Sequence, residues 1–288
     1  MNAAAEPGLA QPSAPRRRHA VITGGSSGIG LAVAARLARS GWNITLIARD
    51  EGRLAHAGEE LRQRVTEDQQ VLCLSADVAQ RSAVEAAISR ALESFGGPDL
   101  LVTSAGVCDP GRAVDLPVEV FERAIQTNYL GSLYPLLACL PAMRAQGHGK
   151  IVLISSGAGL IGIAGYAAYS PAKFALRGLA EVLRCELKPH GIGVTIVYPP
   201  DTDTPQLADE RARRPPETHL IAGMAPTWSA DRMAETILRG LARDRWQIAP
   251  GFQMGMLLRF GSLLKPILFW HFDRVIAKVW KAATTQPR

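Results

Sequence analysis

Short apolar runs alternate with longer amphipathic segments along most of this 288-residue chain. The runs span residues 19–23, 43–48, 71–75, 100–103, 151–154 and 193–198, and each has the length of a buried strand. The segments between them predict helices at 31–40, 51–66, 80–95 and 118–143, with a further helix that starts near Tyr169. This alternation predicts a single α/β domain with a doubly wound parallel sheet, in which ligands bind at the carboxyl ends of the strands.

The pattern weakens at both ends of the chain and at one internal stretch. Residues 1–17 are predicted to form a flexible tail, the α/β domain covers 18–250, and 251–288 form an apolar, basic helical extension. Residues 204–227 are rich in Pro and Arg, which predicts a long loop that acts as a substrate lid.

The predicted helix at 118–143 contains residues that disfavour a regular helix. Asn128 predicts a local kink or a bound water, with a solvated side chain as the alternative. Pro135 and Pro141 are predicted to bend or end the helix.

Composition and charge narrow the possible partners. With 47% apolar and 20% charged residues the chain can bury a full core, and its net charge of +6 is moderate. No basic run carries interleaved aromatics, so nucleic acid is not expected. The four cysteines are widely spaced without a C-x-x-C pair, which predicts reduced thiols in the cytoplasm and no zinc site.

The C-terminal extension combines dense apolar residues with six basic residues and one acidic residue. Arg259 and Lys265 interrupt the apolar run and Pro266 would kink it, so a membrane-spanning helix is not expected. The pattern instead predicts a helix, or a bent pair of helices, that lies at a membrane surface and makes the protein peripheral to the membrane. The alternative is an oligomerisation arm that buries the same face against a second subunit.

A glycine-rich turn joins the first predicted strand to the first helix. Gly24, Gly28 and Gly30 form a G-x-x-x-G-x-G pattern there, which lets the backbone approach a pyrophosphate at the helix N-terminus. The strand–turn–helix context predicts a Rossmann-type dinucleotide site. At the end of the second strand the chain has Ala48-Arg49, and a basic residue there favours the 2′-phosphate of NADPH, with a solvated arginine as the alternative.

A candidate proton-transfer set follows the strand at 151–154. Ser156 lies at the end of that strand, and Tyr169 and Lys173 are four apart, so they share one helix face. A lysine ammonium one turn away is expected to lower the pKa of the tyrosine and make the pair a usable acid and base. Ser156 would hydrogen-bond the oxygen that Tyr169 protonates. An ordinary exposed Tyr and Lys is the alternative for an isolated Y-x-x-x-K.

Taken together, residues 19–250 resemble the short-chain dehydrogenases/reductases. The resemblance rests on TGGSSGIG at 23–30, Asp77, Asn128, Ser156, Tyr169 and Lys173. It implies that Asn128 positions a water linked to Lys173, and that the cofactor contacts Gly24, Ser26, Ser27, Gly28, Ile29, Gly30, Arg49, Asp77, Val78, Ala105, Gly106, Tyr169, Lys173, Pro199, Thr202 and Thr204. Two positions depart from the family pattern: Ser104 replaces the Asn of Asn-Ala-Gly, and Pro200 replaces the glycine of the turn after the sixth strand.

The segments NITLIARD, NYLGSLYP, AYSPAKFALRGLAE and YPPDTDTP are similar to the 3-ketodihydrosphingosine (3-ketosphinganine) reductases of the same superfamily. This resemblance implies reduction of 3-ketosphinganine to sphinganine with NADPH in sphingolipid biosynthesis, with Tyr169 as proton donor. Asp201 and Asp203 are then candidates to meet the substrate's 2-ammonium, with turn aspartates as the alternative. The other readings are a reductase of a different lipophilic ketone (a 3-oxoacyl thioester, steroid or retinoid) and a non-catalytic NADP(H)-binding scaffold. A homodimer or homotetramer stays open.

Overall fold

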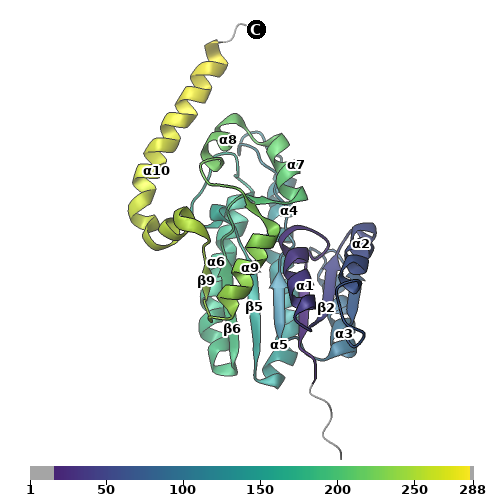
Figure 1. Ribbon diagram of the computed structural model, residues 1–288. Coiled ribbons are helices and arrows are strands. Elements are labelled where there is room, and N and C mark those ends of the chain that lie inside the picture. Colours follow the sequence, from purple (N-terminus) through teal and green to yellow (C-terminus); the bar gives the residue numbers. More distant parts are fainter. Residues whose placement is uncertain (1–15, 286–288) are drawn as a thin grey trace, which may run out of the picture.

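The computed structural model describes residues 16–285, and its centre is a seven-stranded sheet in the order β3-β2-β1-β4-β5-β6-β9 (Figure 1). Every strand pair in the sheet is parallel. The strands are β1 (His19–Thr23), β2 (Asn43–Ala48), β3 (Val71–Ser75), β4 (Leu100–Thr103), β5 (Gly149–Ile154), β6 (Ile192–Val197) and β9 (Gln247–Ile248). Because the order reverses direction between β1 and β4, the carboxyl ends of these two strands form the topological switch point where such folds bind ligands.

Helices cover both faces of the sheet, as the alternating pattern predicted. One face packs against α1 (Gly28–Arg39), α2 (Glu51–Arg62) and α9 (Ala230–Leu241), which share one hydrophobic cluster. The other face packs against α3 (Arg81–Phe95), α5 (Gly131–Gln146) and α6 (Tyr169–Leu187), which share a second. Two short 3₁₀ turns, Gly157–Gly159 and Lys188–His190, flank α6. The doubly wound α/β prediction is confirmed.

The chain departs from α-helical geometry around Asn128, just before α5. A short helix, α4 (Val118–Ala124), runs into a π-helical turn, η1 (Ile125–Leu130), and then into α5. A π-helical turn inserts one extra residue per turn and is common at functional sites. Of the two predicted effects of Pro135 and Pro141, bending or ending the helix, neither proline ends it, because α5 runs through both to Gln146 and buries Met143 in the core.

Residues 204–227, here called the cap segment, are not the long loop that their composition predicted. The segment holds α7 (Pro205–Arg213) and α8 (Pro216–Ala222), each with a proline at the start, where a missing N–H costs nothing. Two short parallel strands, β7 (Thr202–Asp203) and β8 (Trp228–Ser229), join its two ends. The cap segment therefore begins after β7 and ends before its partner strand β8, and it lies above the strand ends of the central sheet in Figure 1.

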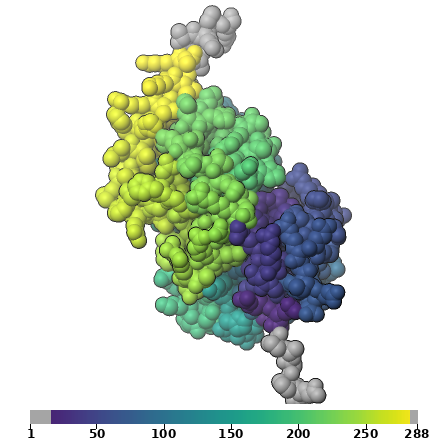
Figure 2. All heavy atoms as spheres, in the orientation of Figure 1, coloured from purple at the N-terminus to yellow at the C-terminus, as the bar shows by residue number. Residues whose placement is uncertain are grey.

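The C-terminal extension is one long bent helix, α10 (Gly251–Thr285), which packs against α8. The bend lies at Phe260, whose φ of −121° and ψ of 17° leave the helical region, and not at Pro266 as predicted. In Figure 2 the yellow atoms of α10 lie against the green atoms of the cap segment. Within residues 16–285 no helix has the length and apolar character needed to cross a bilayer.

Most of the predicted N-terminal tail lies outside the described residues. Its last two residues are described and are attached to the domain. Arg16 bonds both carboxylate oxygens of Asp99 at 3.1 Å, and Arg17 bonds Asp68 at 3.0 Å. These contacts attach the last two residues of the predicted tail to the domain, and the boundary at 18 stays a prediction.

Candidate active site

One large cavity, of about 1110 Å³, opens along the carboxyl ends of the central strands. Its walls come from the loops after β1, β2, β4, β5 and β6, from the cap segment and from the first half of α10. This volume exceeds the roughly 300–1,000 Å³ of a typical small-ligand pocket. The cavity has room for a dinucleotide and a second ligand together.

The glycine-rich turn forms one wall and fits a pyrophosphate. Gly24 has a φ of +66°, and a Cβ there would lie 2.5 Å from the backbone nitrogen of Ala105. A Cβ on Gly30 would lie 2.5 Å from the carbonyl oxygen of Gly24. Helix α1 begins at Gly28, three residues before its predicted start, so its free N–H groups belong to the turn itself. A side chain has no room at Gly24 or Gly30, and the first N–H groups of α1 lack partners within the helix, which suits a phosphate group.

Most of the predicted cofactor residues line this cavity. They are Gly24, Ser26, Ser27, Gly28, Ile29, Arg49, Val78, Ala105, Gly106, Tyr169, Lys173, Pro199, Thr202 and Thr204. Gly30 and Asp77 are absent from the lining. Asp77 instead accepts a 3.0 Å hydrogen bond from the Ala79 N–H and lies 3.6 Å from Arg49.

The predicted proton-transfer set is assembled at the end of β5. Lys173 on α6 donates a 3.0 Å hydrogen bond from Nζ to the carbonyl oxygen of Ile154, and Nζ lies 5.6 Å from the centre of the Tyr169 ring. Ser156 follows β5 and hydrogen-bonds Tyr169, while its Oγ accepts a 3.2 Å bond from the Ala158 N–H. The three side chains predicted from spacing therefore meet in one cavity.

Burial sets the protonation of this set. It lowers the pKa of Lys173 to about 8 and raises the pKa of Tyr169 well above its ordinary value. The net shift of the Tyr169 pKa is therefore upward, opposite to the predicted lowering, because loss of solvent outweighs the favourable contacts of the phenolate. Cys108 and Glu210 raise the pKa of Tyr169 further, and only the hydrogen bond from Ser156 acts in the opposite direction.

Asn128 holds the loop that follows β4. Its amide nitrogen donates to the carbonyl oxygen of Val107, and its Oδ1 accepts from the Val107 N–H, both at 3.0 Å. A Cβ on the neighbouring Gly106 would lie 2.8 Å from Oδ1 of Asn128 and 3.5 Å from Nζ of Lys173. Asn128 thus sets the position of the cavity wall beside Lys173, and its predicted role in holding a water stays a prediction.

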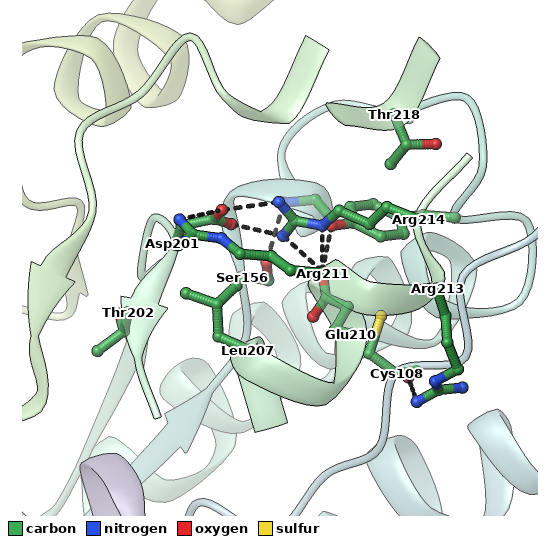
Figure 3. Close-up of polar contacts among 12 residues, drawn as sticks. Cys108, Ser156, Asp201, Thr202, Leu207, Glu210, Arg211, Arg213, Arg214 and Thr218 are labelled. Atoms are coloured by element: carbon green, nitrogen blue, oxygen red, sulfur yellow. Dashed lines mark hydrogen bonds and ion pairs between the residues drawn. The ribbon is translucent and has the colours of Figure 1, made fainter. Parts of the chain in front are cut away.

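A buried ionic network that was not predicted from the sequence joins the cap segment to Asp201, which follows β6, and to Tyr166, which precedes α6 (Figure 3). Arg214 lies at its centre and bonds both oxygens of Asp201 at 2.8 and 2.9 Å. It also bonds Glu210 through Nε at 2.9 Å, and Glu210 accepts a short hydrogen bond from the Tyr166 hydroxyl. The Tyr166 ring packs edge-on against that of Tyr169 with centroids 5.6 Å apart, so the network reaches the predicted proton donor.

This network bears on the two candidate partners for a substrate ammonium. Asp201 lines the cavity, but Arg214 and Arg211 already bond its carboxylate. The side chain of Asp203 is exposed and does not line the cavity. The ammonium-binding role of either residue stays a prediction. A sequence signal for the network existed only as the dense Arg and Asp/Glu spacing of residues 209–214.

The parallel sheet, the phosphate-binding turn and the Ser156–Tyr169–Lys173 set define a nicotinamide-dependent oxidoreductase. The family model for short chain dehydrogenases matches residues 18–215. The chain belongs to the short-chain dehydrogenase/reductase family.

Named relatives give a narrower similarity. A 3-dehydrosphinganine reductase of Danio rerio is 45% identical over 251 residues, covering 86% of this chain and 76% of the relative. A 3-ketodihydrosphingosine reductase of Bos taurus is 42% identical over 261 residues, covering 90% of this chain and 77% of the relative.

Two solved structures share the fold at 27% identity and a TM-score of 0.72, each covering 81% of this chain. One is a short-chain dehydrogenase/reductase from Burkholderia phymatum in complex with NAD, of which 88% is covered. The other is the L-sorbose reductase of Gluconobacter frateurii complexed with NADPH and L-sorbose, of which 93% is covered. Members with this fold therefore bind either nicotinamide dinucleotide.

Proposed function

We propose that this enzyme reduces the C3 ketone of 3-ketosphinganine, a long-chain 2-amino-3-ketone, to sphinganine with NADPH. The observation that carries the proposal is one cavity that holds both the phosphate-binding turn and the Ser156–Tyr169–Lys173 set. The names of the two relatives supply the substrate class. The apolar residues that α10 adds to the cavity suit a ligand with a long alkyl chain.

The side chains divide the work of ketone reduction between them. When bound, NADPH supplies the hydride that the carbonyl carbon accepts. Ser156 donates a hydrogen bond to the carbonyl oxygen, where negative charge develops. Tyr169 then gives its phenolic proton to that oxygen, and its raised pKa keeps the phenol protonated at neutral pH beforehand. The ammonium of Lys173, charged below pH values of about 8, stabilises the phenolate left behind.

The preference for NADPH rests on the end of β2. Arg49 and Arg53 both line the cavity there, where the ribose of an adenine dinucleotide lies in this fold. The Arg49 side chain is 58% exposed and lies 3.6 Å from Asp77, so that ion pair is weak and leaves the guanidinium able to turn toward a phosphate. A 2′-phosphate would meet two cations and the N-terminus of α2.

The outer face of α10 supports attachment to a membrane surface, with the enzyme peripheral on the cytoplasmic side. Leu263 is 75% exposed and Ile267 is 65% exposed, and Trp270 follows one turn later on the same face. Arg274 stacks on the Trp270 ring at 3.8 Å, which places a cation beside the exposed apolar residues. Exposed apolar and aromatic residues flanked by cations match a helix that lies in the headgroup plane of anionic lipids.

Replacing the proton donor tests the reaction. Tyr169→Phe is expected to lose about 10²–10⁴-fold in the rate of 3-ketosphinganine reduction, followed by NADPH absorbance, while NADPH still binds. Tyr198→Phe is the matched control, because Tyr198 is a buried tyrosine outside the cavity lining. Near-normal turnover by Tyr169→Phe would refute the assignment of the proton donor.

A substrate panel tests the choice of ketone. 3-Ketosphinganine is compared with an acetoacetyl thioester, a steroid ketone and a retinoid aldehyde. A wild-type preference for one of the last three would replace the proposed substrate. Binding of NADPH without turnover of any of them would favour the non-catalytic scaffold.

A further inference from the structure

The far part of the cavity is lined by apolar side chains from three separate elements. Ile163 comes from the loop before α6, Ile221 from α8, and Leu257, Leu264, Leu268 and Phe272 from α10. We call this part the apolar arm. It is continuous with the part of the cavity that holds Tyr169 and Ser156.

Helical spacing explains why α10 contributes one continuous wall. Leu264, Leu268 and Phe272 follow one another at intervals of four residues after the bend at Phe260, so they lie on one face of the helix, and Leu257 adds to the wall from before the bend. Leu257 and Phe272 are buried against the core, and Leu264 and Leu268 between them are half-buried. The two ends of this wall are therefore fixed to the domain, and the middle faces the open cavity.

Neighbouring residues on α10 face the other way. Leu263 and Ile267, each one position before a lining residue, are largely exposed. Helix α10 is thus a wall one helix thick, with the cavity on one side and the protein surface on the other. None of the residues that define the apolar arm carries a charge.

Gln253, at the start of α10, also lines the cavity. Its amide nitrogen donates a 2.9 Å hydrogen bond to the carbonyl oxygen of Met224 at the end of the cap segment, and this bond ties the start of α10 to that segment.

We propose that the apolar arm between α8 and α10 is the binding site for the alkyl tail of the substrate, and that Leu264 and Leu268 determine how long a tail it accepts. The proposal rests on the proposed function for the identity of the ketone, but the ligand class, a straight alkyl chain, follows from the arm itself. Each methylene buried in such an arm raises affinity about fourfold, from about 0.8 kcal/mol per CH₂.

Filling the arm tests the proposal. Leu264→Trp places a larger side chain in the arm, and Leu263→Trp is the matched control with the same change on the opposite face. Wild type and both variants are assayed with 3-ketosphinganine and with a homologue whose tail is shorter by several methylenes, both presented in detergent micelles so that vesicle binding plays no part.

The expected result is selective. Leu264→Trp loses about tenfold or more in kcat/KM on the long-chain ketone, the effect of about two or more lost methylenes, and changes little on the short one. Leu263→Trp leaves both substrates near wild type. Equal losses on the two ketones by Leu264→Trp, or no loss at all, would overturn the proposal. If Leu264→Trp does not fold, as judged by thermal unfolding, Leu268→Trp takes its place.

A binding measurement separates failure of the arm from failure of the proposed function. Straight-chain 1-alkanols of increasing length are titrated into the full-length protein by calorimetry. Wild type and Leu263→Trp are expected to bind them more tightly by about fourfold per methylene, with a limit that Leu264→Trp reaches at a shorter chain. If this pattern appears while 3-ketosphinganine is not reduced, the arm stands and the proposed ketone is wrong. If alkanol binding is the same in all three proteins, the arm is not an alkyl site, whatever the ketone.

Discussion

Arg214 is the cation on which two buried carboxylates depend, and its removal is a sharp test of the network in Figure 3. Arg214→Met keeps most of the apolar stem and removes the guanidinium. The Arg214 side chain is 2% exposed, and its partners Asp201 and Glu210 are 15% and 8% exposed. Both carboxylates would lose their strongest partner in a place that water barely reaches.

Removing one member of a buried ion pair typically costs about 3–5 kcal/mol, because the charge left behind stays buried. At roughly 2–4 °C per kcal/mol for a domain of this size, the midpoint of thermal unfolding should fall by about 6–20 °C. Arg211 gives the matched control, since it bonds the same Asp201 carboxylate at 3.3 Å but is 45% exposed. An exposed pair contributes about 0–1 kcal/mol, so Arg211→Met should shift the midpoint by less than about 4 °C.

Circular dichroism during heating measures both variants. A double variant, Asp201→Asn with Arg214→Met, should recover part of the loss, because it removes one of the two stranded charges. Equal shifts for Arg211→Met and Arg214→Met would show that burial of the network does not matter, and the reasoning would fail. The same outcome would mean that the network does not hold the cap segment beside Tyr169.

Three further predictions concern the cofactor, the buried lysine and the outer face of α10. Arg49→Ala should raise the KM for NADPH about tenfold or more and leave NADH little changed, since a charge-assisted bond to phosphate contributes roughly 1.5–3 kcal/mol; equal losses for both cofactors would contradict it. Burial lowers the folded-state pKa of Lys173 from 10.5 to about 8, so the penalty for its charge is present in full below about pH 8 and disappears as the pH rises to about 10.5. Lys173→Met should therefore unfold at a higher urea concentration than wild type at pH values near 7, with a gain that shrinks over that window; a gain independent of pH would rule this out. Replacing Leu263 and Ile267 together by Glu should reduce sedimentation with anionic vesicles while kcat/KM on a short-chain ketone in solution stays near wild type, whereas a change in subunit number alone would favour an oligomerisation arm.

The first six strands of the central sheet were predictable, because they are short apolar runs with a polar or glycine boundary, whereas the two-residue β9 was not predicted. The four strands β1 to β4 have the predicted bounds, and the burial of every residue in β1 and β4 explains why the signal was clear. Helix ends were less predictable. Gly28 and Gly30 are poor helix formers, yet α1 includes them because the close approach of Gly24 and Gly30 fixes the turn there.

The cap segment was missed for a different reason. Its Pro and Arg content suggested a loop, but the prolines stand at the first positions of α7 and α8, where proline favours a helix. Thr204 also caps α7 by accepting a 3.2 Å bond from the Leu207 N–H. A Thr at the N-cap position followed by a Pro at the first helical position is a helix signal that could have been used.

The catalytic set was predictable because a strand end and an i, i+4 pair fix relative positions over short distances. The buried network was not, because Arg214 reaches Asp201 from thirteen residues away and Tyr166 meets Glu210 across forty-four. The predicted downward shift of the Tyr169 pKa was wrong for a related reason. Sequence spacing places Lys173 beside it, but burial depends on the whole cavity wall, including Cys108 and α7.

Helix α10 shows why a count of apolar residues cannot assign a surface. The sequence presents one dense apolar segment, which predicted a helix at a membrane. In the structure the same segment has two apolar faces, because Leu263 and Ile267 point outward while Leu264 and Leu268 line the cavity. Deleting the helix would therefore remove Leu257 and Phe272 from the core and open the cavity, so a truncation cannot test membrane attachment alone. An enzyme whose substrate has a long alkyl chain gains from this arrangement, since the wall that would contact lipid is also the wall that would receive the chain.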